Sequence, residues 1–339
     1  MDKLPELLLP WFSAHHRALP WRRDKEPYHV WLSEIMLQQT RVEAVKNYYE
    51  RFLKQLPTIE SLANADENTL LKLWEGLGYY SRVRNLQKAA QQILQRHGGV
   101  FPQNYDEIRA LSGIGDYTAG AICSICFDQP TPAVDGNVLR VLSRYCLIDR
   151  PINDEKVKKE VAALLAPVYP AGHCGDFTQA LMELGATVCV PNGAPLCQSC
   201  PIKDSCKANQ NGTQLRYPVK AAKKPRKTEH RTVFILRCGD NIALCKRPSK
   251  GLLAGLWQLP DTPGELSAQE ALDQASQWGV MPTAIEKSVS REHIFTHVHW
   301  HLTGIYLRCA EEARFTWVST DELKEKYGLP TAYRQFLEE

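Results

Sequence analysis

The chain has 339 residues, of which 44% are hydrophobic and 23% are charged, a length that suits two domains and the composition of an ordinary folded protein. No apolar run approaches the roughly eighteen residues of a membrane helix. The first residues include Asp2 and Glu6 and lack the features of a secretion signal. We therefore expect a cytoplasmic protein without a membrane partner. The net charge of +3 does not by itself indicate nucleic acid, although the front of the chain is mildly basic and the rear mildly acidic.

The first part of the chain, to about residue 187, carries a helical pattern. Apolar residues recur at intervals of three and four, in segments separated by glycine and proline breakers, and few stretches alternate with a period of two. The segments predicted as helices are 30–54, 66–75, 81–97, 116–127 and 135–147. We therefore predict an all-α region.

The helix predicted from residue 30 carries Glu34 and Gln38, which are four residues apart and would share one face. Trp31, Ile35 and Met36 would cover another, apolar face. For an arbitrary glutamate in such a pattern, a solvated position on an amphipathic helix is the commoner interpretation.

A Leu-Ser-Gly-Ile-Gly run, residues 111–115, lies between two helical segments. Gly113 and Gly115 permit a tight turn with exposed backbone N–H groups, and the next helix would begin at Asp116. Such a turn can bind a phosphate without contacting bases. Alone, the G-x-G pattern would favour a plain connector between helices.

Asp135 precedes Gly136 and Asn137 where a further helix is predicted to begin. Its side chain could simply cap that helix. A carboxylate at this position could also face a cationic sugar, and the two roles are compatible.

The eleven cysteines are an odd number in a chain without a secretion signal, which argues against a disulfide framework. Four of them crowd together, with seven, two and five residues between them: Cys189, Cys197, Cys200 and Cys206. Four soft ligands at this density suit zinc or an iron–sulfur cluster, and composition does not choose between these metals.

Residues 211–230 are predicted to form a basic, exposed linker that includes Lys223 and Lys224, with its charges either solvated or in contact with phosphate. Beyond it the pattern changes to mixed α and β. Strands are predicted over 232–237, 242–245, 299–308 and 315–318, and helices over 265–278 and 320–327. We therefore predict a second domain over 231–339.

The hairpin and the aspartate together carry a resemblance to a known superfamily. Tyr117 to Ile122 follow the hairpin directly, and Val134 to Val138 come about twenty residues after Gly115. This arrangement resembles the helix-hairpin-helix motif and the following loop with aspartate of the base-excision DNA glycosylases. Ser112 stands where that superfamily usually has proline.

Within the superfamily, the segment Trp31 to Thr40 resembles, almost residue for residue, the active-site helix of the adenine DNA glycosylases. Pro20 to Arg22 and Leu77 to Leu86 also resemble that family, so the resemblance extends over most of the chain. It implies a mainly α fold, with an all-helical helix-hairpin-helix glycosylase region, an iron–sulfur cluster loop and a smaller α/β Nudix-like C-terminal domain.

The resemblance also implies the domain boundaries. The catalytic region would span 1–210, with a six-helix part over about 22–130 that contains the hairpin at 111–120, and a cluster part formed by about 1–21 and 131–210. The four clustered cysteines would hold a 4Fe–4S cluster, although the first interval is seven residues here and six in the family. The Nudix-like domain at 231–339 would recognise the lesion.

The implied chemistry is excision of adenine, which needs two carboxyl groups. Glu34 would protonate the base and later activate water, and Asp135 would stabilise the oxocarbenium-like sugar or form a bond to it. Bifunctional relatives have a catalytic lysine where this chain has Tyr117, so the resemblance implies a monofunctional enzyme in which Tyr117 supports the site by hydrogen bonding.

The remaining site residues follow from the same resemblance. The pocket for the flipped adenine would comprise Arg22, Glu183, Asn137 and Gln38. The residues expected to contact DNA are Gly113, Gly115, Gln39, Thr40, Tyr79 and Arg82. The partner would be double-stranded DNA with adenine opposite 8-oxoguanine or guanine, bound by a monomer that is nucleoid-associated if the protein is bacterial.

Phe295, Thr296 and His297 resemble the family's Phe-Ser-His loop, which reads 8-oxoguanine, and the threonine hydroxyl can still bond the lesion. His293, His297 and His299 could instead suggest a metal site, but a half-exposed strand is the preferred alternative.

Three other functions compete with adenine excision. A bifunctional pyrimidine-lesion glycosylase of the endonuclease III type is disfavoured by Tyr117 and by the domain at 231–339. A non-enzymatic DNA-binding module is disfavoured by Glu34 and Asp135 in their matching contexts. A nucleotide pyrophosphohydrolase would need a glutamate-rich Nudix helix, which the segment from Glu265 to Trp278 lacks.

Overall fold

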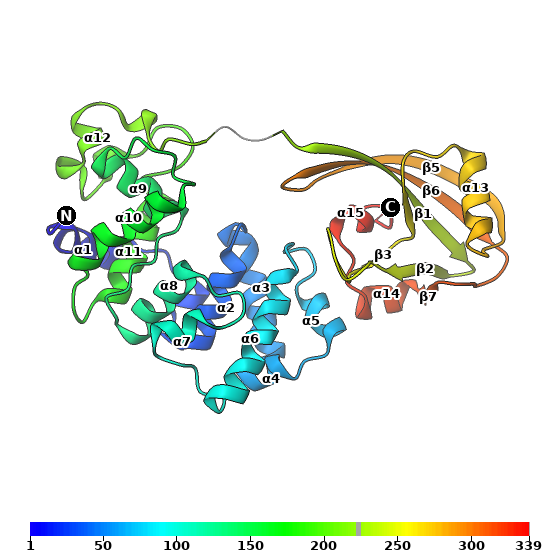
Figure 1. Cartoon of the computed structure of the whole chain (residues 1–339), viewed down its shortest axis with the longest axis horizontal. Helices are drawn as coiled ribbons and strands as arrows, with labels where there is room; N and C mark the ends of the chain where they lie inside the picture. Colours follow the sequence, from blue (N-terminus) through cyan, green and yellow to red (C-terminus); the bar gives the residue numbers. More distant parts are fainter. Residues whose placement is uncertain (222–224, 339) are drawn as a thin grey trace. The chain divides into compact units, whose positions relative to one another are not determined.

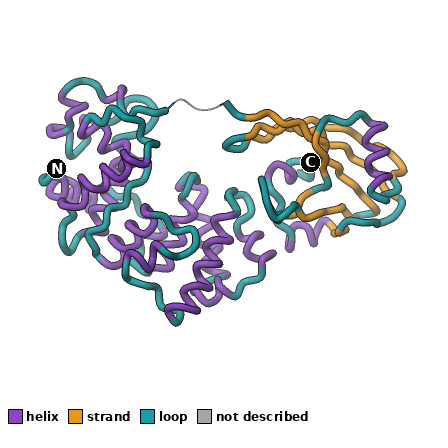
Figure 2. The backbone as a smooth tube through the Cα atoms, in the orientation of Figure 1, coloured by secondary structure: helices purple, strands orange, loops and turns teal. Residues whose placement is uncertain are grey.

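The computed structural model describes residues 1–221 and 225–338, which form two compact units. One unit comprises residues 1–64 and 84–222, and the other comprises 65–83 and 223–339. Figure 2 shows helices throughout the first unit and a sheet in the second. Lys223 and Lys224 of the predicted linker lie outside the described residues. Among the described residues, no helix has the length and apolar character needed to cross a membrane.

The first unit is helical, as predicted (Figure 1). Its α-helices are α1 (Leu4–His15), α2 (Pro27–Leu37), α3 (Val42–Gln55), α4 (Ile59–Ala63), most of α6 (Ser81–His97), α7 (Tyr105–Arg109), α8 (Asp116–Phe127), α9 (Gly136–Cys146), α10 (Glu155–Leu165), α11 (Cys174–Thr187) and α12 (Lys207–Gln210). The bounds predicted for α6 and α8 are confirmed. The buried faces of α1, α9, α10 and α11 form one hydrophobic core.

The prediction of a single helix over 30–54 is wrong. The chain forms α2 and α3 instead, separated by a turn at residues 38–41. Gln39 has a φ of 57°, a left-handed conformation that interrupts the helix. The apolar periodicity continues across this turn because α2 and α3 both face the core, so the sequence pattern conceals the break.

The second unit contains a seven-stranded sheet, built from β1 (Lys227–Cys238), β2 (Asn241–Lys246), β3 (Trp257–Gln258), β4 (Asp261–Pro263), β5 (Pro282–Ile294), β6 (Val298–Cys309) and β7 (Thr316–Ser319). The main strand order is β3-β2-β1-β6-β5; β1 and β6 are parallel, and the other pairs are antiparallel. The first strand begins at Lys227, inside the segment predicted as linker.

Helices cover both faces of this sheet (Figure 1). Phe234 and Leu236 of β1 pack with α13 (Ala268–Gln277), whereas Val233 and Ile235 pack with α14 (Thr320–Lys326) and α15 (Thr331–Arg334). Alternate residues of a strand point to opposite faces, so the two cores lie on either side of one sheet. The mixed α and β domain is therefore confirmed.

The short helix α5 (Glu67–Leu73) and the turn after it belong to the second unit, which the sequence did not predict. Glu75 accepts a hydrogen bond from the backbone N–H of Leu329 at 2.9 Å, and Lys72 donates to the carbonyl of Tyr327 at 3.3 Å. These contacts join segments more than 250 residues apart in the chain.

Candidate active site

A cavity of about 660 Å³ opens among the helices of the first unit. This volume is within the usual range for small-molecule sites. Among its lining residues are nine that the sequence analysis singled out: Arg22, Glu34, Gln38, Gln39, Thr40, Tyr117, Asp135, Asn137 and Glu183. The structure thus brings together residues from α2, α8, α9 and α11, which are spread over about 160 positions of the chain.

Glu34 lies in the buried part of α2, and only 6% of it is exposed. Burial raises the pKa of its carboxyl to about 7, because the charged form loses hydration. A hydrogen bond from Tyr117 and the charge of Arg22 oppose this shift, whereas the charge of Asp135 adds to it. Glu34 can therefore hold a proton near neutral pH and release it to a basic atom in the cavity.

Tyr117 lies in the first turn of α8, one residue after the helix begins. Its hydroxyl donates a hydrogen bond to Oε2 of Glu34. Burial raises the pKa of Tyr117 well above its ordinary value, and the neighbouring Glu34 and Asp135 raise it further. The side chain is therefore a neutral phenol that orients the carboxyl group of Glu34.

Asp135 is the N-cap of α9, which confirms the capping prediction. Its Oδ1 accepts the backbone N–H of Val138 at 2.7 Å, and its Oδ2 accepts a bond from Nδ2 of Asn137 at 2.7 Å. Burial raises the pKa of Asp135, and these two hydrogen bonds and the charge of Arg140 oppose that shift. The cap thus fixes a carboxylate at the wall of the cavity.

Glu183 of α11 is fully buried and is joined to two arginines. Arg17 donates to it from Nε at 2.7 Å and from Nη2 at 2.9 Å, and Arg22 donates from Nη2 at 2.9 Å. Burial alone would raise the pKa of this carboxyl, but the hydrogen bonds from Arg17 and Arg22 outweigh it and lower the pKa to about 2. Glu183 is therefore an anion that positions Arg22 at the cavity; Arg17, which also lines it, was missed by the sequence analysis.

Gln38 is not on the helix that carries Glu34, contrary to the predicted i, i+4 pairing. It follows the end of α2, and its amide donates to the Thr118 hydroxyl at 3.5 Å. Gln38, Gln39 and Thr40 nevertheless all line the cavity, because the turn between α2 and α3 forms part of its rim.

The glycine hairpin connects α7 to α8 in the first unit. Gly113 has a φ of 76°, and a Cβ atom there would lie 2.6 Å from Cβ of Asn85, so only glycine fits. Gly115 is the N-cap of α8 in an extended conformation. Its surroundings are open, and the first N–H groups of the twelve-residue helix α8 follow directly, as a phosphate contact requires.

Tyr79 and Arg82 lie in the second unit and differ in exposure. Tyr79 has a φ of 47° and is 46% exposed, as expected of a side chain that contacts DNA. Arg82 is buried; it donates to the carbonyls of Leu77 and Gly78, and burial lowers its pKa to about 10. In this conformation Arg82 supports the turn before α6.

The loop of residues 295–297 connects β5 to β6. The ring of Phe295 packs edge-on against Trp300, with 4.8 Å between ring centroids, whereas Thr296 and His297 are exposed. The hydroxyls of Thr296 and Tyr79, both in the second unit, are 2.5 Å apart. Phe295 thus fixes the loop, the hydroxyl of Thr296 is hydrogen-bonded to that of Tyr79, and His297 presents its imidazole to solvent.

Cys189, Cys197, Cys200 and Cys206 line one pocket in the first unit. Burial and the neighbouring thiols raise the pKa of Cys200 to about 12, and burial also raises the pKa of Cys197 and Cys206. A bound metal reverses this effect, because it stabilises the thiolate. Arg144 donates to Sγ of Cys189 at 3.1 Å and supplies a positive charge beside the group. The donor set and its cationic neighbour fit a four-thiolate metal site.

Two family models match the chain. Residues 32–167 match the HhH-GPD superfamily base excision DNA repair protein, and residues 232–339 match the NUDIX domain. The two matches correspond to the helical region and to the sheet domain, so the predicted fold class is confirmed.

Curated relatives match most of the chain. It is 36% identical to the adenine DNA glycosylase of Homo sapiens over 86% of this chain, and it spans 64% of the length of that protein. The adenine DNA glycosylase of Schizosaccharomyces pombe is 34% identical, with 96% of this chain and 86% of the relative covered. The adenine DNA glycosylase of Buchnera aphidicola subsp. Acyrthosiphon pisum is 33% identical, with 98% of this chain and 96% of the relative covered.

Two solved structures each resemble a part of the chain. A thermostable thymine-DNA glycosylase has a TM-score of 0.56 and 27% identity, with 61% of this chain and 94% of that chain covered. A trapped endonuclease III–DNA covalent intermediate has a TM-score of 0.52 and 23% identity, with coverages of 62% and 94%, and this second likeness shows the fold alone.

Proposed function

Because the chain belongs to the adenine DNA glycosylase family, we propose that it removes adenine from mispaired DNA by hydrolysing the N-glycosidic bond. The observation that supports this most is the pair of carboxyl groups at one cavity, the buried Glu34 and the half-buried Asp135. Their environments differ: Glu34 receives one hydrogen bond from a phenol, whereas Asp135 receives two N–H donors that favour its anion. Such a pair can divide acid and anion roles.

The proposed reaction begins when adenine leaves the base stack and enters the cavity. Protonated Glu34 donates its proton to N7 as the C1′–N9 bond breaks, and the bonding electrons leave with the base. Asp135 stabilises the cationic sugar, either by its charge or by a bond to C1′. Glu34, now a carboxylate, takes a proton from water while the water oxygen bonds to C1′, and the acid is restored.

Tyr117 supports a monofunctional reaction, because a phenol cannot form the Schiff base that leads to strand cleavage. The experiment that tests the proposed function is incubation with a duplex that carries adenine opposite 8-oxoguanine. We expect free adenine, and strand breaks only after alkali treatment. No adenine release would refute the function, and efficient borohydride trapping of the protein on DNA would refute the monofunctional assignment.

We also propose that the second unit distinguishes 8-oxoguanine from guanine through residues 295–297. The replacement of Thr296 by alanine should change little, because its hydroxyl is bonded to Tyr79. The double replacement Phe295→Ala/His297→Ala should reduce the preference for 8-oxoguanine:A over G:A by about tenfold, the worth of one base-reading contact. The measurement is the ratio of single-turnover rates on the two duplexes.

The matched control for the loop replacements is Met281→Ala/Glu311→Ala, which changes exposed positions outside the loop in the same unit. An unchanged rate ratio in the Phe295→Ala/His297→Ala variant would contradict the assignment.

The four clustered cysteines are proposed to hold a 4Fe–4S cluster, which would stabilise the fold of the loop from Cys189 to Cys206 when bound. The positive charge of Arg144 beside Cys189 suits the net negative charge of such a cluster. We expect about four irons per chain and a broad visible absorption band, both lost in Cys200→Ala and retained in Cys238→Ala. Stoichiometric zinc without iron would contradict the proposal.

A further inference from the structure

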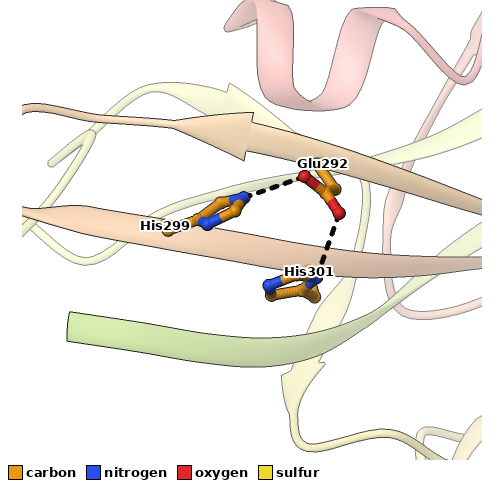
Figure 3. A group of neighbouring side chains, drawn as sticks. All are labelled: Glu292, His299 and His301. Atoms are coloured by element: carbon orange, nitrogen blue, oxygen red, sulfur yellow. Dashed lines mark hydrogen bonds and ion pairs between the residues drawn. The ribbon is translucent and has the colours of Figure 1, made fainter. Parts of the chain in front are cut away.

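Two histidines and a glutamate meet on the sheet of the second unit (Figure 3). Nε2 of His299 is 3.0 Å from Oε2 of Glu292, and Nδ1 of His301 is 3.4 Å from Oε1 of the same carboxylate. The three potential ligand atoms all lie within 4.8 Å of one another. Each carboxylate oxygen thus faces a different imidazole nitrogen.

The sheet itself dictates this arrangement. His299 and His301 are two positions apart on β6, so their side chains point to the same face of the sheet. Glu292 of β5 is directly opposite His301 in the antiparallel register, a position that brings Cβ atoms to about 5 Å. The three side chains are therefore held by paired backbone, which preorganises them better than a loop would.

The dimensions fit a small divalent cation. With Zn–N and Zn–O bonds of about 2.0–2.1 Å, ligand atoms around tetrahedral zinc are about 3.3 Å apart. The imidazole nitrogens lie at similar separations from the Glu292 carboxylate, 3.0 Å from Oε2 for His299 and 3.4 Å from Oε1 for His301. The ligand nitrogens of His299 and His301 are at most 4.8 Å apart. A modest rotation of one imidazole ring would bring them to the separation expected around zinc.

The surroundings leave room for exchange with solvent and hold one ring in place. His230 of β1, which is beside His301 in the parallel register, stacks on it with 5.0 Å between centroids and 16° between planes. The His301 ring also packs against the ring of His299, with 4.4 Å between centroids, and its Nδ1 faces Glu292. The side chains of Glu292 and His299 are 60% and 26% exposed, so a cation and its water ligand have access.

We propose that Glu292, His299 and His301 form a zinc-binding site that ties β5 to β6 at the root of the loop of residues 295–297. His299 pairs with Ile294 in the last rung before that loop, so a bound ion would restrain both strands where the loop begins. Two imidazoles and a carboxylate suit zinc, and three protein ligands leave the fourth position to water. The site stands independently of the proposed glycosylase function.

The grouping differs from the one that the sequence suggested. His293 is on the opposite face of β5 and packs against Phe295, with 4.5 Å between ring centroids, and His297 lies in the exposed loop. The spacing of histidines along one strand could not reveal Glu292, which comes from the neighbouring strand.

The test is a calorimetric titration of Zn²⁺ into the full chain, purified with its cysteine site loaded and stripped of loosely bound metal with a chelator. The wild type should take up one more Zn²⁺ per chain than the His299→Asn/His301→Asn variant. Glu292→Gln should bind zinc at least tenfold more weakly, because the amide oxygen carries no negative charge.

The control variant is His15→Asn/His173→Asn, which removes two exposed histidines, one of them 3.7 Å from the carboxylate of Asp176. It should bind zinc as the wild type does. Hydrogen exchange provides a second readout: zinc should slow amide exchange over residues 292–301 in the wild type but not in His299→Asn/His301→Asn. Equal zinc uptake by wild type and that variant, or exchange that zinc does not change, would overturn the proposal.

Discussion

Replacement of Glu34 by glutamine should reduce the single-turnover rate of adenine release by about a thousandfold or more, while DNA binding remains within about twofold of the wild type. The reason is chemical: the amide is nearly isosteric and still accepts the hydrogen bond from Tyr117, but it has no acidic proton to give to the base. The measurements are base release with enzyme in excess and a binding titration on the same duplex.

The same variant should be more stable than the wild type above neutral pH. The pKa of Glu34 is about 7 in the folded chain and near 4.5 in the unfolded chain. Between pH 4.5 and pH 7 the folded chain therefore binds more protons than the unfolded chain, and its stability falls as the pH rises through this range. Above pH 7 glutamine removes this cost, which is up to about 3 kcal/mol.

A thermal melt at pH 8 therefore separates loss of chemistry from loss of fold. Glu60→Gln, at an exposed position of α4, is the matched control and should change neither rate nor stability. Activity that survives in Glu34→Gln would show that another group is the acid.

Replacement of Asp135 by asparagine should slow adenine release by about a hundred- to a thousandfold, because it removes the anion proposed to stabilise the developing sugar cation. Asparagine is as good an N-cap as aspartate, so its carbonyl oxygen can still accept the backbone N–H of Val138 and α9 should persist. The measurement is the single-turnover rate beside a circular dichroism spectrum.

Asp154→Asn is the matched control for this variant. Asp154 caps α10 by accepting the backbone N–H of Lys156 at 2.9 Å, but it does not line the cavity. Asp154→Asn should therefore leave the rate of adenine release unchanged. A comparable loss of rate in both variants would mean that helix capping, and not charge at the sugar, explains the effect of Asp135.

Local sequence rules predicted much of the helical unit. The bounds of α6 and α8 follow from apolar spacing and from the glycines that flank them, and Asp135 is the cap that its position before Gly136 suggested. The family resemblance predicted further site residues. Nine of the predicted site residues line the same cavity.

Other features depend on tertiary structure that no local pattern carries. The turn at Gln39 is hidden, because apolar residues on both sides of it face the core. Arg17 lies 166 positions from Glu183, so nothing in its own neighbourhood indicates the ion pair. Strand β5 is mostly exposed and polar, and only its pairing with β6 defines it as a strand.

The most direct test of the central claim is the pH dependence of adenine release under single-turnover conditions. If Glu34 is the acid, the rate should be constant below its pKa of about 7 and fall about tenfold per pH unit above it. Burial raises the pKa of Glu34, whereas the hydrogen bond from Tyr117 lowers it. Tyr117→Phe should therefore shift the pH at which the rate begins to fall upward by about one unit. Tyr48→Phe is the control and should not shift it. A rate that stays constant to pH 9, or a fall that Tyr117→Phe does not move, would contradict the assignment of Glu34 as the proton donor.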